Sequence, residues 1–416
     1  MTTPTRPRIA LVCDWLTTPG GAEKVLLELH HMYPDAPIYT SQYRAKGIGW
    51  FCDATIKTGW LNIFPAALRK FLGPLRQLYF SHLDLTDYDI VISVTGAEAK
   101  SVKTRKKPRK GRTCTARTSS NTYHLCYCHV PTQYYWQMYD KYLAHPGFGI
   151  LDPLARFGIK LLVKPLRKAD FRAARRPDQF VTISHHAAEQ IQKYYHRVAK
   201  VVAPPVEVGK FSQNRHRPKL STNFSTGYYV ISCRQAPWKR VDLAVEACKN
   251  LKKPLLVIGD GAEHANLVKL AGESPYIQFI PWLDAGELSA YLEYAKGYIF
   301  PSMEPFGIAA VEALAAGCPV IAYAQGGSRD IVLPGKNGVF FDEQTVESLS
   351  DALREFESQN FDRTVIKHTA ETFKAQNFQS RIKRLIAAHF DRLVAAAPAK
   401  PTSSDPNPKL ESESAA

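Results

Sequence analysis

The chain has 416 residues, and with 45% hydrophobic and 22% charged side chains its composition is that of an ordinary soluble globular protein. This length predicts two or three domains whose cores need no disulfide, and no stretch approaches the ~20 apolar residues of a membrane span. The net charge of +16 indicates a polyanionic partner without distinguishing nucleic acid, anionic lipid and phosphorylated ligands.

The eight cysteines are spread thinly, and several lie in apolar runs, as Cys13 does in Ile9–Cys13. Reduced and buried thiols have this setting, so we expect a reducing compartment. The basic opening Met1–Arg8 precedes an apolar run that is too short for a signal peptide and favours a strand. We therefore expect a cytoplasmic protein, with peripheral association with the inner face of the plasma membrane as an option.

The first half of the chain alternates short apolar runs with amphipathic stretches. A tight turn at Gly20-Gly21 precedes a helix expected at Ala22–His31. This alternation predicts a parallel sheet covered by helices. Strands are expected at Arg8–Cys13, Asp89–Val94, Leu125–Cys128 and Gln179–Ile183.

The same alternation restarts after Pro204-Pro205 and again indicates a parallel sheet. One strand in this half ends at the glycine turn Gly259–Gly261. Strands are expected at Tyr228–Cys233, Pro254–Ile258, Gln278–Pro281, Gly297–Phe300 and Pro319–Ala322. Helices are expected at Val241–Asn250, Ala285–Tyr294 and Glu312–Ala316.

We predict an α/β protein with two doubly wound domains, residues 1–203 and 204–374, joined near Val201–Phe211. Ligands of such sheets bind at the carboxyl ends of the strands, so the cleft between the domains is the expected site. Three segments fall outside this pattern: the basic run Lys100–Arg117, a long final helix at Ala375–Leu393, and Pro398–Ala416, which is expected to be disordered.

The most informative stretch is Pro301–Ala322, where a strand leads into a loop and then a helix. Pro305 suits the first turn of a helix, because its missing N–H would have no partner there. Gly307 lets a ligand approach the backbone closely. The free amides at Phe306–Ile308 and the positive end of the helix dipole then predict an anion site fit for a diphosphate.

Two carboxylates belong to the same stretch. Glu312 would lie roughly 12 Å along the helix axis from Glu304, at 1.5 Å per residue. One carboxylate could therefore meet a sugar and the other a more distant ribose. The alternative is a helix whose acidic first turn only complements its dipole.

Fixed positive charge follows the predicted strand Tyr228–Cys233. A diphosphate needs such charge, and no metal-binding cluster is evident in the sequence. The guanidinium of Arg234 and the ammonium of Lys239 are the available substitutes. The alternative interpretation of this segment is a solvated helix cap.

Two stretches of the sequence contain residue types that can bind a metal ion. Cys126, Cys128 and His129 suggest zinc, but zinc needs four ligands and no second cysteine pair has matching spacing. We favour a strand ending at His129, with the histidine entering the cleft. Asp87 and Asp89 precede a strand, as an ordinary turn does, so a metal-binding Asp-x-Asp is not expected.

Together these motifs resemble the family 4 retaining glycosyltransferases, whose GT-B fold has two Rossmann-like domains facing a central cleft. The resemblance is carried by Glu304-x7-Glu312, by Pro-Phe-Gly, and by the following Ala-x-Gly-x-Pro-Val-Ile-Ala, and it covers the chain from Ile9 to about Val332. It implies that Glu304 contacts the donor sugar. It also implies that Glu312 accepts hydrogen bonds from the ribose hydroxyls.

The resemblance gives the other candidates their roles. Arg234 and Lys239 would bind the donor phosphates, and His129 would contact the donor sugar and support the reaction. The backbone of Phe279–Leu288 would read the nucleobase, and Ala375–Leu393 would cross back to complete the first domain. The expected donor-binding set is Gly20, Gly21, Gly259, Phe306, Gly307, Ile308 and Glu312.

The chain departs from the family pattern at three positions. Asp330 stands where an acidic residue after Gly326-Gly327 is usually Glu. In the subgroup with Tyr-Cys-His-x-Pro, an Arg and an Asp are replaced by Gln133 and Gln137. The changes at Gln133 and Gln137 concern the expected contacts with the acceptor and not the fold.

The resemblance implies a retaining hexosyltransferase without metal or other cofactor, whose domains close around its substrates. It would move a hexose, with mannose from GDP-mannose favoured, from a nucleotide-diphospho-sugar to a glycan or lipid-diphosphate acceptor of surface polysaccharide. An anionic membrane surface is an expected partner and nucleic acid is not, since Lys100–Arg117 lacks interleaved aromatics. The alternatives are a nucleic-acid-binding protein acting through residues 100–117, or another GT-B enzyme such as a phosphorylase or epimerase.

Overall fold

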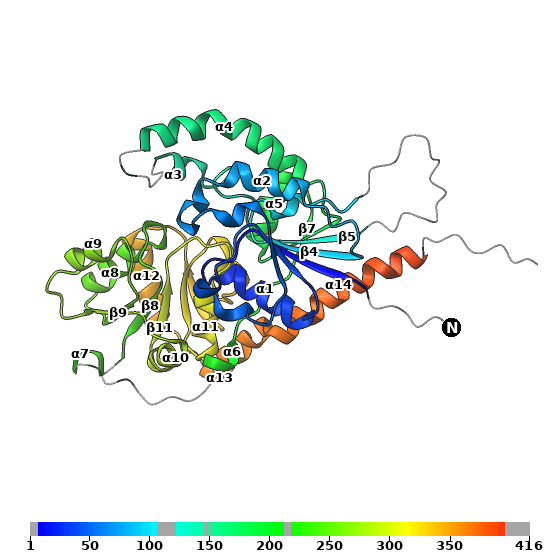
Figure 1. Cartoon of the computed structure of the whole chain (residues 1–416). Coiled ribbons are helices and arrows are strands. Elements are labelled where there is room, and N and C mark those ends of the chain that lie inside the picture. Colours follow the sequence, from blue (N-terminus) through cyan, green and yellow to red (C-terminus); the bar gives the residue numbers. More distant parts are fainter. Residues whose placement is uncertain are drawn as a thin grey trace, which may run out of the picture.

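The computed structural model describes residues 7–105, 122–144, 149, 152–211, 218, 220, 222–225 and 227–395. The described strands form two parallel sheets with helices on their faces, and the two units lie side by side (Figure 1). The predicted tail Pro398–Ala416 and most of the basic run, residues 106–117, lie outside the described residues.

The first domain is built on a seven-stranded sheet with the order β3-β2-β1-β4-β5-β6-β7. All six residues of β4 and of β5 are buried, which is the pattern of strands covered on both faces. The strands are β1 (Ile9–Cys13), β2 (Ile38–Thr40), β3 (Ile56–Thr58), β4 (Ile90–Thr95), β5 (Tyr123–Cys128), β6 (Gln179–Thr182) and β7 (Ala199–Val201).

Helices of two kinds cover this sheet. The α-helices are α1 (Gly21–Met32), α2 (Gly73–His82), α3 (Tyr139–Ala144), α4 (Asp152–Ala173) and α5 (His185–Tyr195). The short 3₁₀ helices are η1 (Ala45–Gly47), η2 (Gly49–Phe51), η3 (Trp60–Ile63), η4 (Ala66–Lys70) and η5 (Ala99–Ser101). Of these, α4 lies along the outer edge of the molecule above α2, against which it packs (Figure 1).

The second domain is built on a six-stranded sheet with the order β10-β9-β8-β11-β12-β13. Its central strands β8, β9 and β11 are fully buried. The strands are β8 (Tyr229–Ser232), β9 (Leu255–Ile258), β10 (Ile277–Ile280), β11 (Gly297–Phe300), β12 (Val320–Tyr323) and β13 (Gly338–Phe341).

The helices of the linker and the second domain follow in chain order. They are α6 (Val208–Phe211), α7 (Thr222–Ser225), η7 (Pro237–Lys239), α8 (Val241–Asn250), α9 (His264–Ala271), α10 (Ala285–Tyr294), α11 (Ile308–Ala315), η8 (Gly326–Asp330), α12 (Val346–Glu357), α13 (Arg363–Ala370), η9 (Glu371–Phe373) and α14 (Ala375–Ala395). In α8 and α10 the observed bounds equal the predicted ones.

The predicted fold class is confirmed, because both sheets are parallel and doubly wound. In each sheet the chain order reverses between the first strand and the fourth, at β1/β4 and at β8/β11. Loops at the carboxyl ends of these strands diverge and leave room for a ligand. The two reversal points therefore fix where a site can form.

The final helix α14 lies against the first domain, although it follows the second domain in the chain (Figure 1). The ring of His389 stacks on Tyr123 at 3.7 Å between centroids, and Gln379 donates a hydrogen bond to Glu28. These contacts tie the end of the described chain to β5 and α1. Among the described residues, no helix combines the length and the low polarity that a membrane span requires.

Lys100 opens the basic run Lys100–Arg117, through which the nucleic-acid-binding alternative would act, and yet it is only 1% exposed. Its ammonium pairs with Asp170 at 2.6 Å and donates to Thr132. The same carboxylate accepts hydrogen bonds from Trp136 and Tyr195. Lys100 therefore holds α4 and the segment after β5 in place and is not available to a partner.

Candidate active site

A cavity of about 720 Å³ lies between the two domains at the carboxyl ends of both sheets. Another hollow, of about 950 Å³, lies beside the linker and the start of α14, but it contains none of the predicted site residues. We therefore take the interdomain cleft as the candidate active site. All but two of the predicted residues line it: Gly21, His129, Arg234, Lys239, Glu304, Phe306, Gly307, Ile308 and Glu312.

Lys239 and Glu304 form an ion pair within this cleft. The Lys239 ammonium lies 2.5 Å from Glu304 Oε1, and the same oxygen accepts a hydrogen bond from Ser302 at 2.7 Å. Lys239 comes from η7, after β8, and Glu304 from the loop after β11, so the two adjacent central strands bring them together. About one fifth of each side chain is exposed, so both remain open to a ligand.

Arg234 is exposed in the cleft and is positioned by its buried neighbour Gln235. The Gln235 side chain donates to the carbonyl of Gly259 at 2.8 Å and contacts His264 at 2.8 Å. A Cβ on Gly259 would lie 2.4 Å from the carbonyl oxygen of Cys233, so only glycine permits this approach. Gly259 does not line the cleft. It allows the turn after β9 to pack closely against the loop after β8, which carries Arg234.

The helix α11 begins at Ile308, so Pro305 lies before the helix and not in its first turn as predicted. Gly307 occupies the N-cap with φ of 126°, a conformation that glycine adopts without strain. No side chain caps the helix, and its first N–H groups have no partner within the helix. These amides, with the positive end of the dipole, face the cleft and suit an anion.

Glu312 is the fifth residue of α11, whereas Glu304 belongs to the preceding loop. The estimate of 12 Å along one helix axis therefore does not apply, because only Glu312 is helical. Lys24 of α1 lies 3.9 Å from Glu312 and 3.8 Å from Glu207 of the linker. Burial raises the pKa of Glu312 to about 7, although Lys24 lowers it in part.

His129 is the first residue after β5, and its backbone N–H donates to the Thr95 carbonyl at 2.9 Å. The ring packs edge-on against Tyr127, at 5.5 Å between centroids. Its Nε2 atom is buried and has no hydrogen-bond partner among the described residues. Burial lowers its pKa to about 4, so the ring is neutral near pH 7 and can donate or accept one hydrogen bond.

The glycine loop after β1 contributes differently from the prediction. Gly21 lines the cleft, whereas Gly20, the N-cap of α1, does not. Glu23, in the first turn of α1, also lines the cleft, and burial raises its pKa to about 7. No sequence signal separated Glu23 from any acidic residue in a first helical turn.

Asp14 is a second residue whose part only the structure defines. It is buried at the end of β1 and accepts hydrogen bonds from Thr95 and from the amides of Gly96, Ala97 and Ala99. This carboxylate fastens the loop after β4 to the loop after β1. Because its oxygens are already satisfied within the protein, we assign Asp14 to positioning and not to chemistry.

Direct contacts join the two domains at the edge of the cleft. Ser184, at the start of α5, donates to the Pro305 carbonyl at 2.5 Å. The backbone N–H of His185 donates to Asp330 at 2.7 Å, and the His185 ring lies 2.7 Å from the other oxygen of that carboxylate. Asp330, the residue that departs from the family's usual Glu, thus caps a helix of the opposite domain.

The cysteines and aspartates of the two possible metal sites lie in other surroundings. Cys126 and Cys128 pack in a buried cluster with Phe180, and Asp89 lies 3.7 Å from Arg8 in an exposed pair. Among the described residues, no group of three or more His, Cys, Asp or Glu side chains is arranged to hold a metal ion.

Residues 212–373 match the family model described as "Glycosyl transferases group 1". The chain is similar to a D-inositol 3-phosphate glycosyltransferase of Nocardioides sp., with 30% identity over 37% of this chain and 40% of the relative. It is also similar to a GDP-mannose-dependent alpha-(1-6)-phosphatidylinositol monomannoside mannosyltransferase of Mycolicibacterium smegmatis, with 27% identity over 36% and 44% of the two chains. The chain thus spans less than half the length of these two relatives.

Among solved structures, the fold is similar to that of the lipopolysaccharide outer core galactosyltransferase WaaB in its apo form. The TM-score is 0.63 and the identity 16%, over 92% of this chain and 99% of that chain. The resemblance to glycosyltransferases and the predicted GT-B fold are therefore confirmed.

Proposed function

We propose that this chain, with a glycosyl transferases group 1 sequence in its second domain and a GT-B fold throughout, is a retaining hexosyltransferase that uses a nucleotide-diphospho-sugar. One observation carries the proposal. Two cationic side chains after β8 and the uncapped start of α11 converge on a single cleft between the domains. Such a site is built to stabilise a diphosphate as it leaves.

The donor would lie across the carboxyl end of the second sheet. Its phosphates would contact Arg234, Lys239 and the amides at the start of α11. Glu312, in the second turn of α11, would accept hydrogen bonds from the ribose hydroxyls. Trp282 lines the same cleft after β10, where the segment Phe279–Leu288 would read the nucleobase.

The chemical step exchanges one bond to the anomeric carbon for another on the same face. The bond from C1 to the phosphate oxygen lengthens and breaks, and the acceptor hydroxyl oxygen bonds to C1. The hydroxyl proton passes to a phosphate oxygen of the leaving diphosphate. Glu304 and the neutral His129 ring would hold the sugar hydroxyls while Arg234 and Lys239 stabilise the departing charge.

We expect catalysis without a metal ion, since protein cations and oriented amides take the place of a divalent ion at the diphosphate. Turnover of the donor should stay within about twofold when EDTA is present, and added Mg²⁺ or Mn²⁺ should not raise it further. The measurement is release of the nucleoside diphosphate at saturating donor. Loss of turnover in EDTA with recovery on adding Mn²⁺ would overturn the metal-independent mechanism.

The titration of Glu312 predicts how donor affinity depends on pH. As the pH falls through about 7 the carboxylate takes up a proton and becomes a weaker acceptor for the ribose hydroxyls. The donor KM should therefore rise about five- to tenfold from pH 8 to pH 6, with a much smaller change in kcat.

Two variants test that assignment. Glu312→Gln should have a high donor KM that no longer changes over this pH range. The control Glu347→Gln, at an exposed position on α12 away from the cleft, should retain the profile of the parent chain. A profile that is unchanged in Glu312→Gln would remove Glu312 from ribose binding.

We propose GDP-mannose as the donor and a glycan or lipid-linked acceptor of cell-surface polysaccharide at a membrane face. Support for the donor comes from the relative named as GDP-mannose-dependent, and support for a phosphorylated or lipid acceptor from the names of both relatives. A screen of nucleotide sugars by thermal shift tests the donor, because a ligand that binds the native state raises Tm. Stabilisation by another nucleotide sugar, with none by GDP-mannose, would replace this donor.

A further inference from the structure

Most of the large hydrophobic side chains that are exposed among the described residues belong to one region of the first domain. They lie on η3, η4, α2, α3 and α4 or directly beside them, and α2 packs against α4 and η3. A monomeric soluble protein rarely exposes apolar side chains in such concentration unless another surface covers them. They are Trp60, Ile63, Leu68, Phe71, Leu75, Leu78, Tyr142, Leu154, Phe157, Leu161 and Leu162.

The outer side of α4 carries the clearest part of this surface. Leu154, Phe157 and Leu161 are 69%, 66% and 65% exposed, and Pro165 is exposed as well. Their spacing of three, four and four residues places them on one face of the helix. A stripe of this kind normally faces a protein core, whereas here it faces outward.

The inner side of α4 is firmly held. Val163, Asp170 and Ala173 are buried, and the Asp170 carboxylate makes the ion pair with Lys100 described above. Arg167 donates to the Tyr135 carbonyl at 2.6 Å and lies over the Trp136 ring. The outward orientation of the apolar stripe is therefore fixed by buried polar contacts on the opposite side.

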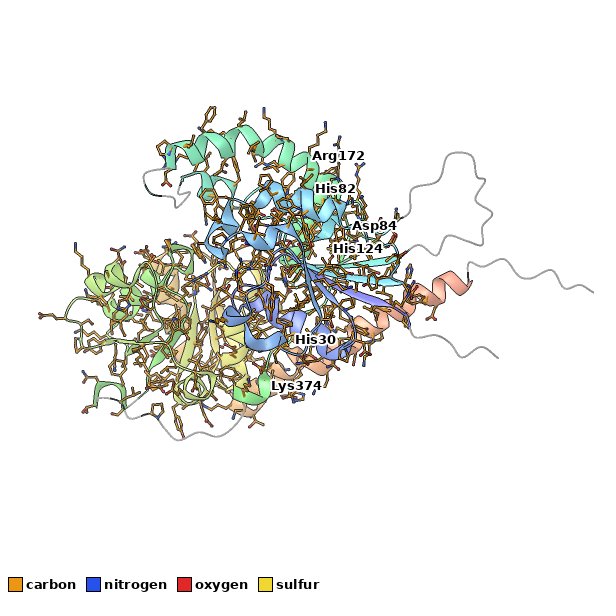
Figure 2. All side chains as sticks on the ribbon, in the orientation of Figure 1. His30, His82, Asp84, His124, Arg172 and Lys374 are labelled. Atoms are coloured by element: carbon orange, nitrogen blue, oxygen red, sulfur yellow. The ribbon has the colours of Figure 1, made fainter. Side chains whose placement is uncertain are left out.

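A row of cations runs beside the apolar stripe. Arg156, Lys160, Lys164 and Lys168 are exposed and follow one another at intervals of four residues. None of the three lysines forms an ion pair with another residue that the structure describes. Figure 2 shows Arg172, one more turn along the chain, at the same end of the helix as His82 of α2.

We propose that the outer face of α4 is a membrane-docking surface that takes anionic phospholipid. Apolar side chains flanked by a row of exposed cations match the boundary between acyl chains and anionic headgroups, which a protein partner's mixed surface would not require. The helix would lie in the plane of this boundary with Leu154, Phe157 and Leu161 inserted. This inference rests on the proposed function in one respect, which is that a lipid-linked acceptor would approach the enzyme from the side of α4.

The position of α4 agrees with such a role. It belongs to the first domain, which contributes His129 and Gln133 to the cleft, and it packs against α3, whose Tyr142 lines the same cleft. A bilayer against α4 would therefore lie beside the first domain's wall of the site. A lipid-linked acceptor could reach the cleft from that side without leaving the membrane.

The test is co-sedimentation of the full chain with vesicles of 30% phosphatidylglycerol in phosphatidylcholine, against pure phosphatidylcholine. We expect binding to the anionic vesicles, lowered at least about tenfold in Phe157→Glu/Leu161→Glu. The matched control Val198→Glu/Val268→Glu makes the same changes at exposed valines elsewhere and should bind as the parent does. Lys160→Gln/Lys164→Gln should lose about tenfold at low salt, unlike the control Lys200→Gln/Lys269→Gln.

Equal binding by Phe157→Glu/Leu161→Glu and the parent chain, or no binding by the parent, would overturn the proposal. Donor hydrolysis without vesicles provides the separate readout, and it should be the same in the parent and in Phe157→Glu/Leu161→Glu. Donor turnover without vesicle binding would reject the docking surface alone. Vesicle binding without turnover of any nucleotide sugar would reject the proposed enzyme and keep the surface.

Discussion

Replacing Lys239 by alanine should lower kcat by about 10²–10³ and leave the fold intact. The ammonium is one of two cations at the proposed diphosphate position. Its electrostatic stabilisation of the diphosphate is greatest as the leaving group gains charge. The loss should appear in kcat more than in the donor KM, since the interaction strengthens in the transition state. Product formation at saturating donor, together with a thermal melt, measures both parts of this expectation.

Lys253→Ala is a matched control for this variant. Lys253 pairs with Glu357 at 2.6 Å, close to the 2.5 Å of Lys239 and Glu304, and it is similarly exposed, but it lies outside the cleft. Its removal should leave kcat unchanged. Full activity in Lys239→Ala would refute the phosphate role of Lys239.

Replacing Asp170 by alanine should destabilise the first domain by about 3–5 kcal/mol. The change leaves the Lys100 ammonium, which is 1% exposed, without its carboxylate, and it removes the acceptor of Thr132, Trp136 and Tyr195. A buried charge that has lost its partner is among the costliest changes a core can undergo. Urea unfolding followed by tryptophan fluorescence should show the first transition at markedly lower denaturant.

The corresponding control removes an exposed carboxylate. Asp351 pairs with Arg354 on α12, where more than half of each side chain is exposed, so Asp351→Ala should change the free energy of unfolding by no more than about 0.5 kcal/mol. If Asp170→Ala were as mild as this control, the buried network could not be what fixes α4 and the segment after β5.

The sequence predicted the central strands well because they are continuous apolar runs bounded by turns. β11 and the helices α8 and α10 have their predicted bounds, and α10 begins at a complete capping box of Asp284 and Glu287. The strands β2, β3, β7 and β13 were not predicted. β2, β3 and β7 have only three residues each, too few to establish a period, and lie toward the edges of their sheet.

The candidate active site was likewise predictable from the sequence only in part. Arg234, Lys239, Glu304 and Glu312 could be selected because their residue types and spacing suit a diphosphate and two sugars. Their convergence depends on β8 and β11 being neighbours in the sheet although they are far apart in the chain. The contacts that Lys24, Ser184 and Asp330 make across the domain boundary could not be predicted, because each partner lies more than 100 positions away in the chain.

The sequence by itself determined the doubly wound architecture and the chemistry available in the second domain, because periodicity and motif spacing are local properties. Only the tertiary structure decided which charges face the cleft and which are buried. It placed Lys100 in the core against Asp170, left Gly20 and Gly259 outside the cleft, and turned the apolar stripe of α4 outward. The physical reason is that burial and pairing depend on what packs against a side chain, and those neighbours come from distant parts of the chain.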